Sequence, residues 1–123
     1  MRLLLDTHVI LWWLADDPKL GPRHRDAIAD VRNDVLVSAV SIAEMAITAS
    51  LGKLDAPPGI AEILDAQGLV ALPFTAAHAE RLRDLPWHHR DPFDRMLVVQ
   101  AQAEDLRLVT VDDRVRAYDV AVL

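Results

Sequence analysis

The sequence of 123 residues contains no cysteine, so the chain can form neither disulfide bonds nor thiolate metal sites. Long apolar runs are also absent. The run at residues 9–14 is far too short to span a bilayer, and the run at residues 3–5 is too short for the core of a signal peptide. We therefore expect a soluble cytoplasmic protein without a membrane segment.

Positive charge is scarce as well. The chain has 13 Lys and Arg against 19 Asp and Glu, which gives a formal net charge of −6. Proteins that bind nucleic acid normally carry a basic surface, so the charge alone argues against such a partner. Two conditions reverse that argument: a metal ion can neutralise clustered acids, and a basic protein can complement an acidic surface.

The composition that remains, 52% hydrophobic and 26% charged, is typical of a globular protein, and residues 1–123 are predicted to form a single domain. Apolar runs of strand length alternate with helical patterns, which predicts an α/β fold with a short parallel sheet flanked by helices. The helix at residues 41–50 is apolar on nearly all sides and is expected to be buried. Pro73 places the third strand near a sheet edge. The expected strands are residues 2–5, 34–37, 69–74, 106–110 and 117–123, and the expected helices are residues 7–14, 23–31, 41–50, 59–66, 75–85 and 92–105.

Four acidic residues fall where the expected strands end. Asp6 directly follows the first strand, and Glu44 lies one turn into the helix after the second. Asp94 lies in the first turn of the longest expected helix, and Asp112 follows the fourth strand. Because ligands of open parallel sheets bind beyond the carboxyl ends of the strands, we expect these four side chains to converge at one edge.

Converging carboxylates without His or Cys ligands form a site of hard oxygen donors. Such a site suits Mg²⁺, or Mn²⁺ as a substitute, better than Zn²⁺. Mg²⁺ retains several waters and uses few carboxylates, which leaves room for a substrate phosphate. The matching chemistry is hydrolysis of a phosphodiester bond by metal-activated water.

Structural roles compete with this hypothesis at several positions. Glu44 follows Ser41 at the spacing of a capping box. Asp91 precedes a proline and is expected to cap the helix that follows, where Asp94 would also interact favourably with the helix dipole. Each acid taken singly is therefore explained by helix capping as well as by metal binding, and only the set of four favours a metal site.

The residues beside Asp94 and Asp112 allow more than one interpretation. Asp112 and Asp113 are adjacent, so either could be the fourth acid or the cap of the last turn. Arg95, next to Asp94, is the arginine that we single out for contact with an RNA phosphate; the alternatives are a solvated surface charge or an ion pair with a nearby Asp. Thr110 could contact RNA, orient a carboxylate or simply end a strand.

The chain resembles the PIN-domain ribonucleases, and more closely the VapC-type toxins of prokaryotic toxin–antitoxin pairs. Four segments carry the resemblance in order and at the expected spacing, and together they span nearly the whole chain. They are LLLDTH at residues 3–8, VSAVSIAE at residues 37–44, HRDPFDRML at residues 89–97 and LVTVD at residues 108–112.

That resemblance implies a PIN fold and an endoribonuclease that inhibits growth by cleaving RNA. It implies that Asp6, Glu44, Asp94 and Asp112 are catalytic. Of these, Asp6, Asp94 and Asp112 are predicted to bind Mg²⁺ or Mn²⁺, with Asp91 as an auxiliary acid. It also implies a homodimer and a VapB-type antitoxin that occludes the site. The alternative is a PIN-like module that binds without catalysis.

Overall fold

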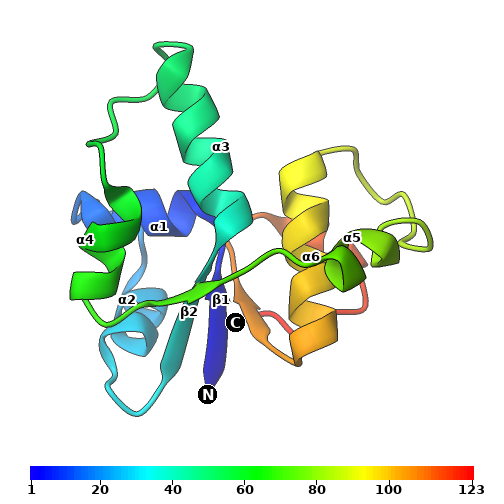
Figure 1. The fold of residues 1–123 in the computed structure, drawn as a ribbon. Helices are drawn as coiled ribbons and strands as arrows, with labels where there is room; N and C mark the ends of the chain where they lie inside the picture. Colours follow the sequence, from blue (N-terminus) through cyan, green and yellow to red (C-terminus); the bar gives the residue numbers. More distant parts are fainter.

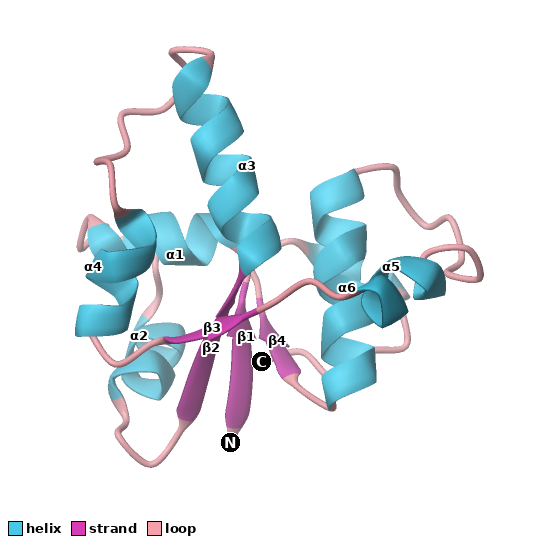
Figure 2. Cartoon of the chain, in the orientation of Figure 1, coloured by secondary structure: helices cyan, strands magenta, loops and turns pink.

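Four short parallel strands form one sheet, and helices cover both of its faces (Figure 1, Figure 2). The computed structural model describes residues 1–123. The strands are β1 (Arg2–Leu5), β2 (Asp34–Ser38), β3 (Val70–Leu72) and β4 (Arg107–Val109). The helices are α1 (Thr7–Leu14), α2 (Pro22–Ala29), α3 (Ala39–Ser50), α4 (Ile60–Ala66), α5 (Ala76–Arg81) and α6 (Pro92–Glu104), followed by a short 3₁₀ helix, η1 (Asp113–Ala117).

The strand order is β3-β2-β1-β4, and every pairing is parallel. Leu5 of β1 pairs with Val37 of β2 on one side and with Val109 of β4 on the other. The predicted α/β fold is confirmed, and β3 lies at the sheet edge as Pro73 indicated. The inner strands β1 and β2 are apolar after their first residue, except at Ser38, because both faces of a parallel sheet are buried, whereas the edge strand β3 is largely exposed.

The sheet separates two hydrophobic cores. Successive side chains of a strand point to opposite faces, so Leu3 and Leu5 enter one core while Leu4 enters the other. The first core lies under α1, α2 and α4, and the second lies under α6. Figure 1 shows this division, with α1, α2 and α4 to the left of the strands and α5 and α6 to the right.

Strand order reverses at β1. The chain proceeds from β1 to β2 and β3 on one side and later returns to place β4 on the other side. The segments that follow β1 and β4 pack on opposite faces: α1 contributes Val9 and Ile10 to the first core, and η1 contributes Val115 to the second. Such a reversal leaves a crevice at the carboxyl ends of the strands, where ligands of α/β proteins bind.

Three expectations about individual elements were wrong. The α3 helix is not buried on all sides: Ala43, Ala46 and Ile47 are exposed because the helix projects beyond the sheet (Figure 1). The helix expected at residues 75–85 ends at Arg81, where the chain tightens into bonds of 3₁₀ type. The final strand is reduced to one parallel bridge between Leu108 and Val122. No helix of the structure is both long and apolar enough to cross a membrane.

Leu4 of β1 has no exposed surface and sits in the centre of the sheet. We expect Leu4→Ala to lower the free energy of unfolding by about 3 kcal/mol, because the substitution leaves a cavity that the surrounding strands cannot fill. Val31 is 97% exposed, so Val31→Ala should stay within about 0.5 kcal/mol of the wild type. Urea denaturation checks both values, and equal losses in the two variants would contradict the placement of the core.

Candidate functional site

Asp6 lies at the point where the strand order reverses. Its backbone N–H donates to the carbonyl of Val109 at 3.0 Å, which extends the pairing of β1 with β4 by one residue. Its Oδ1 caps α1 by accepting from the N–H of Val9 at 3.2 Å. The residue is only 6% exposed. A buried carboxylate needs hydrogen-bond donors, and Asp6 obtains them from the turn into α1 and from β4.

Thr110 is the donor from the β4 side. Its hydroxyl donates to Oδ2 of Asp6 at 2.5 Å and accepts from the backbone N–H of Asp112 at 3.1 Å. The side chain is buried, so it orients a carboxylate, which is one of the roles that the sequence left open. Because its hydroxyl is engaged on both sides, Thr110 does not fit the predicted contact with RNA.

Glu44 reaches the same edge from α3. Its Oε1 accepts a hydrogen bond from the hydroxyl of Thr7 at 2.5 Å. The capping-box alternative is wrong, because α3 begins earlier than expected and Ser38 is its N-cap. Burial raises the pKa of Glu44, the Thr7 hydrogen bond opposes that change, and the charges of Asp91 and Asp6 add to the rise.

Asp94 lies in the first turn of α6. Asp91 caps this helix, as predicted, by accepting from the N–H groups of Phe93 and Asp94. The side chain of Asp94 meets the imidazole of His89, with Oδ2 at 3.3 Å from Nε2. Burial raises the pKa of Asp94 to about 6, and the negative charges of Asp91, Asp6 and Asp112 contribute to the rise against the opposing His89 hydrogen bond.

Asp112 and Asp113 are clearly distinguished by the structure. Asp112 caps η1 and forms a bidentate ion pair with Arg114, at 2.7 Å to Nη2 and 3.0 Å to Nε. Hydrogen bonds from Arg114 lower the pKa of Asp112. The side chain of Asp113 is 97% exposed and lies 3.6 Å from Arg116. Since Asp112 is the member of the pair whose charge acts on Asp94, it is the better candidate for the fourth acid.

Arg95 has a different environment from the one expected. It is 3% exposed, and its guanidinium donates to the carbonyls of Leu85 and Pro86 and to the hydroxyl of Tyr118. The ring of Trp87 stacks over it at 3.7 Å. With its donors engaged inside the protein, Arg95 anchors the loop before α6, so the structure does not support the predicted contact with an RNA phosphate.

Two side chains that contact the acids or their partners were not predicted from the sequence. Thr7 donates a hydrogen bond to Glu44. Its position directly after Asp6 could have marked it in the sequence as a residue of the site. Tyr118 contacts His89 and lies near the end of the chain, where no local pattern marked it. Both act through contacts between segments that are distant in sequence.

The acidic side chains form an electrostatic cluster rather than a preformed metal cage. Asp6, Asp91 and Asp112 all raise the pKa of Asp94, which places their charges around a common point. As the side chains stand, no three His, Asp or Glu residues lie close enough together to hold a metal ion. The donor set of carboxylate oxygens nevertheless suits a hard divalent cation. Such a cation would relieve the repulsion that adds to the effect of burial on the pKa of Asp94.

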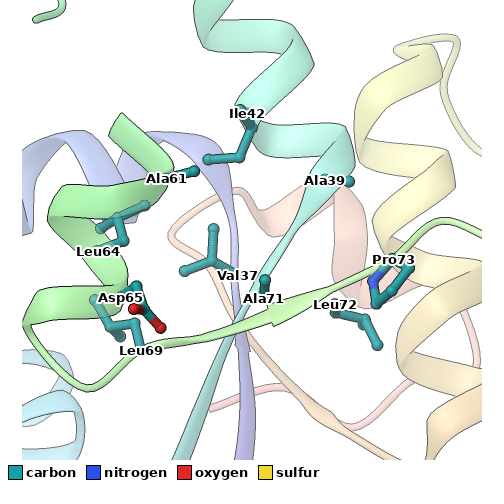
Figure 3. Close-up of a pocket in the computed structure, with 10 residues that line it drawn as sticks. All are labelled: Val37, Ala39, Ile42, Ala61, Leu64, Asp65, Leu69, Ala71, Leu72 and Pro73. Carbon is teal, nitrogen blue, oxygen red and sulfur yellow. The ribbon is translucent and has the colours of Figure 1, made fainter. Parts of the chain in front are cut away.

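A separate apolar groove of about 370 Å³ lies away from the acids (Figure 3). It is bounded by β2, β3, α3 and α4, and its only carboxylate is that of Asp65. Because none of the clustered acids lines it, the groove has no part in the chemistry of the acidic cluster. The lining residues are Val37, Ala39, Ile42, Ala61, Leu64, Asp65, Leu69, Ala71, Leu72 and Pro73.

The fold and the site together define an α/β protein whose parallel sheet gathers carboxylates at the point where its strand order reverses. Comparison with known families gives this class a name. The sequence profile of the PIN domain matches residues 3–121, and the chain therefore belongs to the PIN domain family.

Individual proteins are similar to the chain along nearly its whole length. Ribonuclease VapC22 of Mycobacterium tuberculosis (strain ATCC 25618 / H37Rv) is 29% identical over 119 residues, covering 94% of this chain and 91% of that protein. The VapBC2 complex of Rickettsia felis, bound to a DNA fragment from its promoter, superposes with a TM-score of 0.74 at 17% identity over 100% of this chain and 98% of its own. DNA-bound VapBC from Salmonella typhimurium gives a TM-score of 0.68 at 19% identity over 100% and 97% of the two chains. The two structures establish similarity of fold.

The raised pKa of Asp94 predicts a specific effect on stability in the absence of metal. The pKa rises from its ordinary value of 3.8 to about 6 in the folded chain, so the stability gained by protonation is complete below about pH 4 and is lost as the pH rises through 6. Asp94→Asn removes the ionised form and should raise the free energy of unfolding at about pH 8 by up to about 3 kcal/mol. Urea denaturation in EDTA at two pH values measures the difference.

The matched control is Asp113→Asn, which changes the same chemical group on an exposed side chain. It should leave the free energy of unfolding within about 0.5 kcal/mol of the wild type at both pH values. If Asp94→Asn destabilised the protein equally at about pH 4 and about pH 8, the pKa of Asp94 would not be raised in the folded chain.

Proposed function

We propose that the chain is a Mg²⁺-dependent endoribonuclease, the toxin of a VapC-type toxin–antitoxin pair. The observation that carries the proposal is the convergence of carboxylates around Asp94, at the carboxyl edge of the sheet, in a member of the PIN domain family. The similarity to ribonuclease VapC22 supports RNA as the substrate.

Asp6, Asp94 and Asp112 are the residues that would hold Mg²⁺, with Mn²⁺ as a substitute. The cation would supply polarisation of a phosphoryl oxygen and activation of water at neutral pH. Asp6 is fixed in orientation by Thr110 and by its capping bond, whereas Asp112 is held by Arg114 and would need to leave that partner to act as a ligand.

Glu44 is the acidic residue of the site that we do not assign as a metal ligand. Burial raises its pKa, so it is a stronger base than an exposed glutamate, and its second carboxylate oxygen remains available while Oε1 is held by Thr7. We assign it the acceptance of a proton from the attacking water. Asp91 is engaged in capping α6 and contributes negative charge to the site without a direct role in this scheme.

Phosphate binding falls to arginines other than Arg95. Arg90 is exposed beside Asp91, and the side chain of Arg114 is 65% exposed beside Asp112. Their guanidinium groups are suited to bidentate contact with phosphate oxygens. In this scheme Arg114 would contact the substrate phosphate instead of Asp112.

Partners follow from the same proposal. The two solved structures named above are VapBC complexes, which supports a VapB-type antitoxin as the cytoplasmic partner that blocks the site. The net charge of −6 suits association with a basic protein. We also propose a homodimer as the form in solution.

A catalytically inactive PIN-like module is the second candidate function. The observation that favours it is that no three potential ligands are gathered closely enough to hold a metal ion. Titration with Mn²⁺ separates the two candidates, because absence of binding together with an unchanged melting temperature would support the inactive module.

Substitution of single acids tests the nuclease directly. We expect Asp94→Asn and Asp6→Asn each to reduce Mg²⁺-dependent RNA cleavage by about 100-fold or more, because each removes a charged ligand from the metal. Both variants should also abolish growth arrest when expressed. Cleavage of labelled RNA, with and without EDTA, provides the measurement.

The adjacent acids provide an internal control. Asp112→Asn should be as inactive as the other two, whereas Asp113→Asn should retain wild-type cleavage because its side chain faces solvent. Full activity of Asp6→Asn and Asp94→Asn, or cleavage that persists in EDTA, would refute the proposed mechanism. The opposite ranking of Asp112 and Asp113 would assign the fourth acid to Asp113.

The proposed assembly makes a prediction of its own. Purified protein should have the mass of a homodimer by light scattering, and coexpression with a VapB-type antitoxin should remove the growth arrest. A monomer at every concentration tested would contradict the dimer without affecting the assignment of the active site.

A further inference from the structure

A continuous network of hydrogen bonds connects the interior to Asp94. Nη1 of Arg95 donates to the Tyr118 hydroxyl at 3.0 Å, and that hydroxyl lies 2.8 Å from Nδ1 of His89. On the other side of the imidazole, Nε2 lies 3.3 Å from Oδ2 of Asp94. All members except Asp94 are nine-tenths or more buried, so water does not substitute for these contacts.

The donors and acceptors around Tyr118 determine where its proton lies. Two obligatory donors, the Arg95 guanidinium and the backbone N–H of His89 at 3.3 Å, point at its oxygen and occupy both lone pairs. The hydroxyl must therefore donate its own proton, and Nδ1 of His89 at 2.8 Å is a closer acceptor than the His89 carbonyl at 3.5 Å. An imidazole that accepts at Nδ1 carries its proton at Nε2, which faces Asp94.

We propose that Tyr118 is a positioning residue of the active site, which fixes His89 as the Nε2–H tautomer so that its ring donates to Asp94. The role in metal binding rests on the proposed function. The hydrogen bond holds Oδ2 of Asp94 in one orientation and leaves Oδ1 for a cation. Partners of this kind, which touch a ligand but not the metal, set the direction and the affinity of metal ligands.

Tyr118 lies between two parts of the site that are distant in sequence and holds them together. Tyr118 directly follows η1, the element capped by Asp112, while His89 and Asp94 belong to the loop and helix on the other side. The ring of Tyr118 packs edge-on against His89 at 5.4 Å between centroids. The same side chain therefore links the third and fourth acids of the cluster, although neither of them touches it.

Tyr118→Phe is the decisive variant, because it keeps the packed ring and removes only the hydroxyl. In wild-type protein, ¹⁵N NMR of the imidazole should show a protonated Nε2 and an Nδ1 that accepts a hydrogen bond. In Tyr118→Phe the Nδ1 signal should move to that of a free, unprotonated nitrogen. Calorimetric titration should show Mn²⁺ affinity weakened by about 10-fold.

Two sets of variants distinguish a positioning role of Tyr118 from a general loss of structure around the site. His88 also packs against the Tyr118 ring, at 4.8 Å, but forms no bond to an acid, so His88→Leu should keep wild-type Mn²⁺ affinity. His89→Gln retains an amide donor near the Nε2 position and should keep more Mn²⁺ affinity than His89→Leu. This comparison decides the question if Tyr118→Phe does not fold.

Unchanged Mn²⁺ affinity in folded Tyr118→Phe, equal affinities of His89→Gln and His89→Leu, or a wild-type imidazole protonated at Nδ1 would each overturn the proposal. Failure of the proposed function has a different signature: the wild type itself would bind no Mn²⁺ and cleave no RNA. In that case the NMR comparison still decides whether Tyr118 sets the tautomer of His89.

Discussion

The parallel pairing of β1 with both β2 and β4 is the constraint on which the site depends. An inner strand with two parallel neighbours brings three carboxyl ends to one edge, and so the segments that carry Asp6, Glu44 and Asp112 all leave the sheet there despite their separation in sequence. The reversal of strand order beside β1 sends α1 and η1 to opposite faces.

Hydroxyl groups hold two of the acids once the sheet has brought them together. Thr110 donates to Asp6 and Thr7 donates to Glu44, while the imidazole of His89 contacts Asp94. A neutral donor fixes the direction of a carboxylate without cancelling its charge, whereas an ion pair does both. Asp112 differs from these two acids, because its partner is the guanidinium of Arg114. The hydroxyl donors therefore fix the directions of Asp6 and Glu44 without placing a positive charge beside them.

The order of the elements and the edge at which the acids meet could be predicted from the sequence, because apolar periodicity sets strands and helices and parallel alternation sets the edge. The partners of individual side chains could not. Thr110 and Asp6 are 104 residues apart, and the burial of Arg95 depends on the carbonyls of a loop and on Tyr118. The exposed face of α3 was missed because its apolar residues are a local pattern, whereas its position beyond the sheet is a property of the whole fold.

Under the proposed function, the acidic character of the chain makes RNA binding depend on the metal. With a net charge of −6 and carboxylates at the reaction centre, the metal-free site repels a phosphodiester. Asp112 would be a ligand of a divalent cation, whose charge would offset that of the acids, and Arg114, now paired with Asp112, would then be available to the substrate. Metal binding and RNA binding are then thermodynamically coupled, and by reciprocity RNA must strengthen the binding of the metal. The overall charge, which alone argues against nucleic acid, thus becomes a means of making substrate binding depend on the cation.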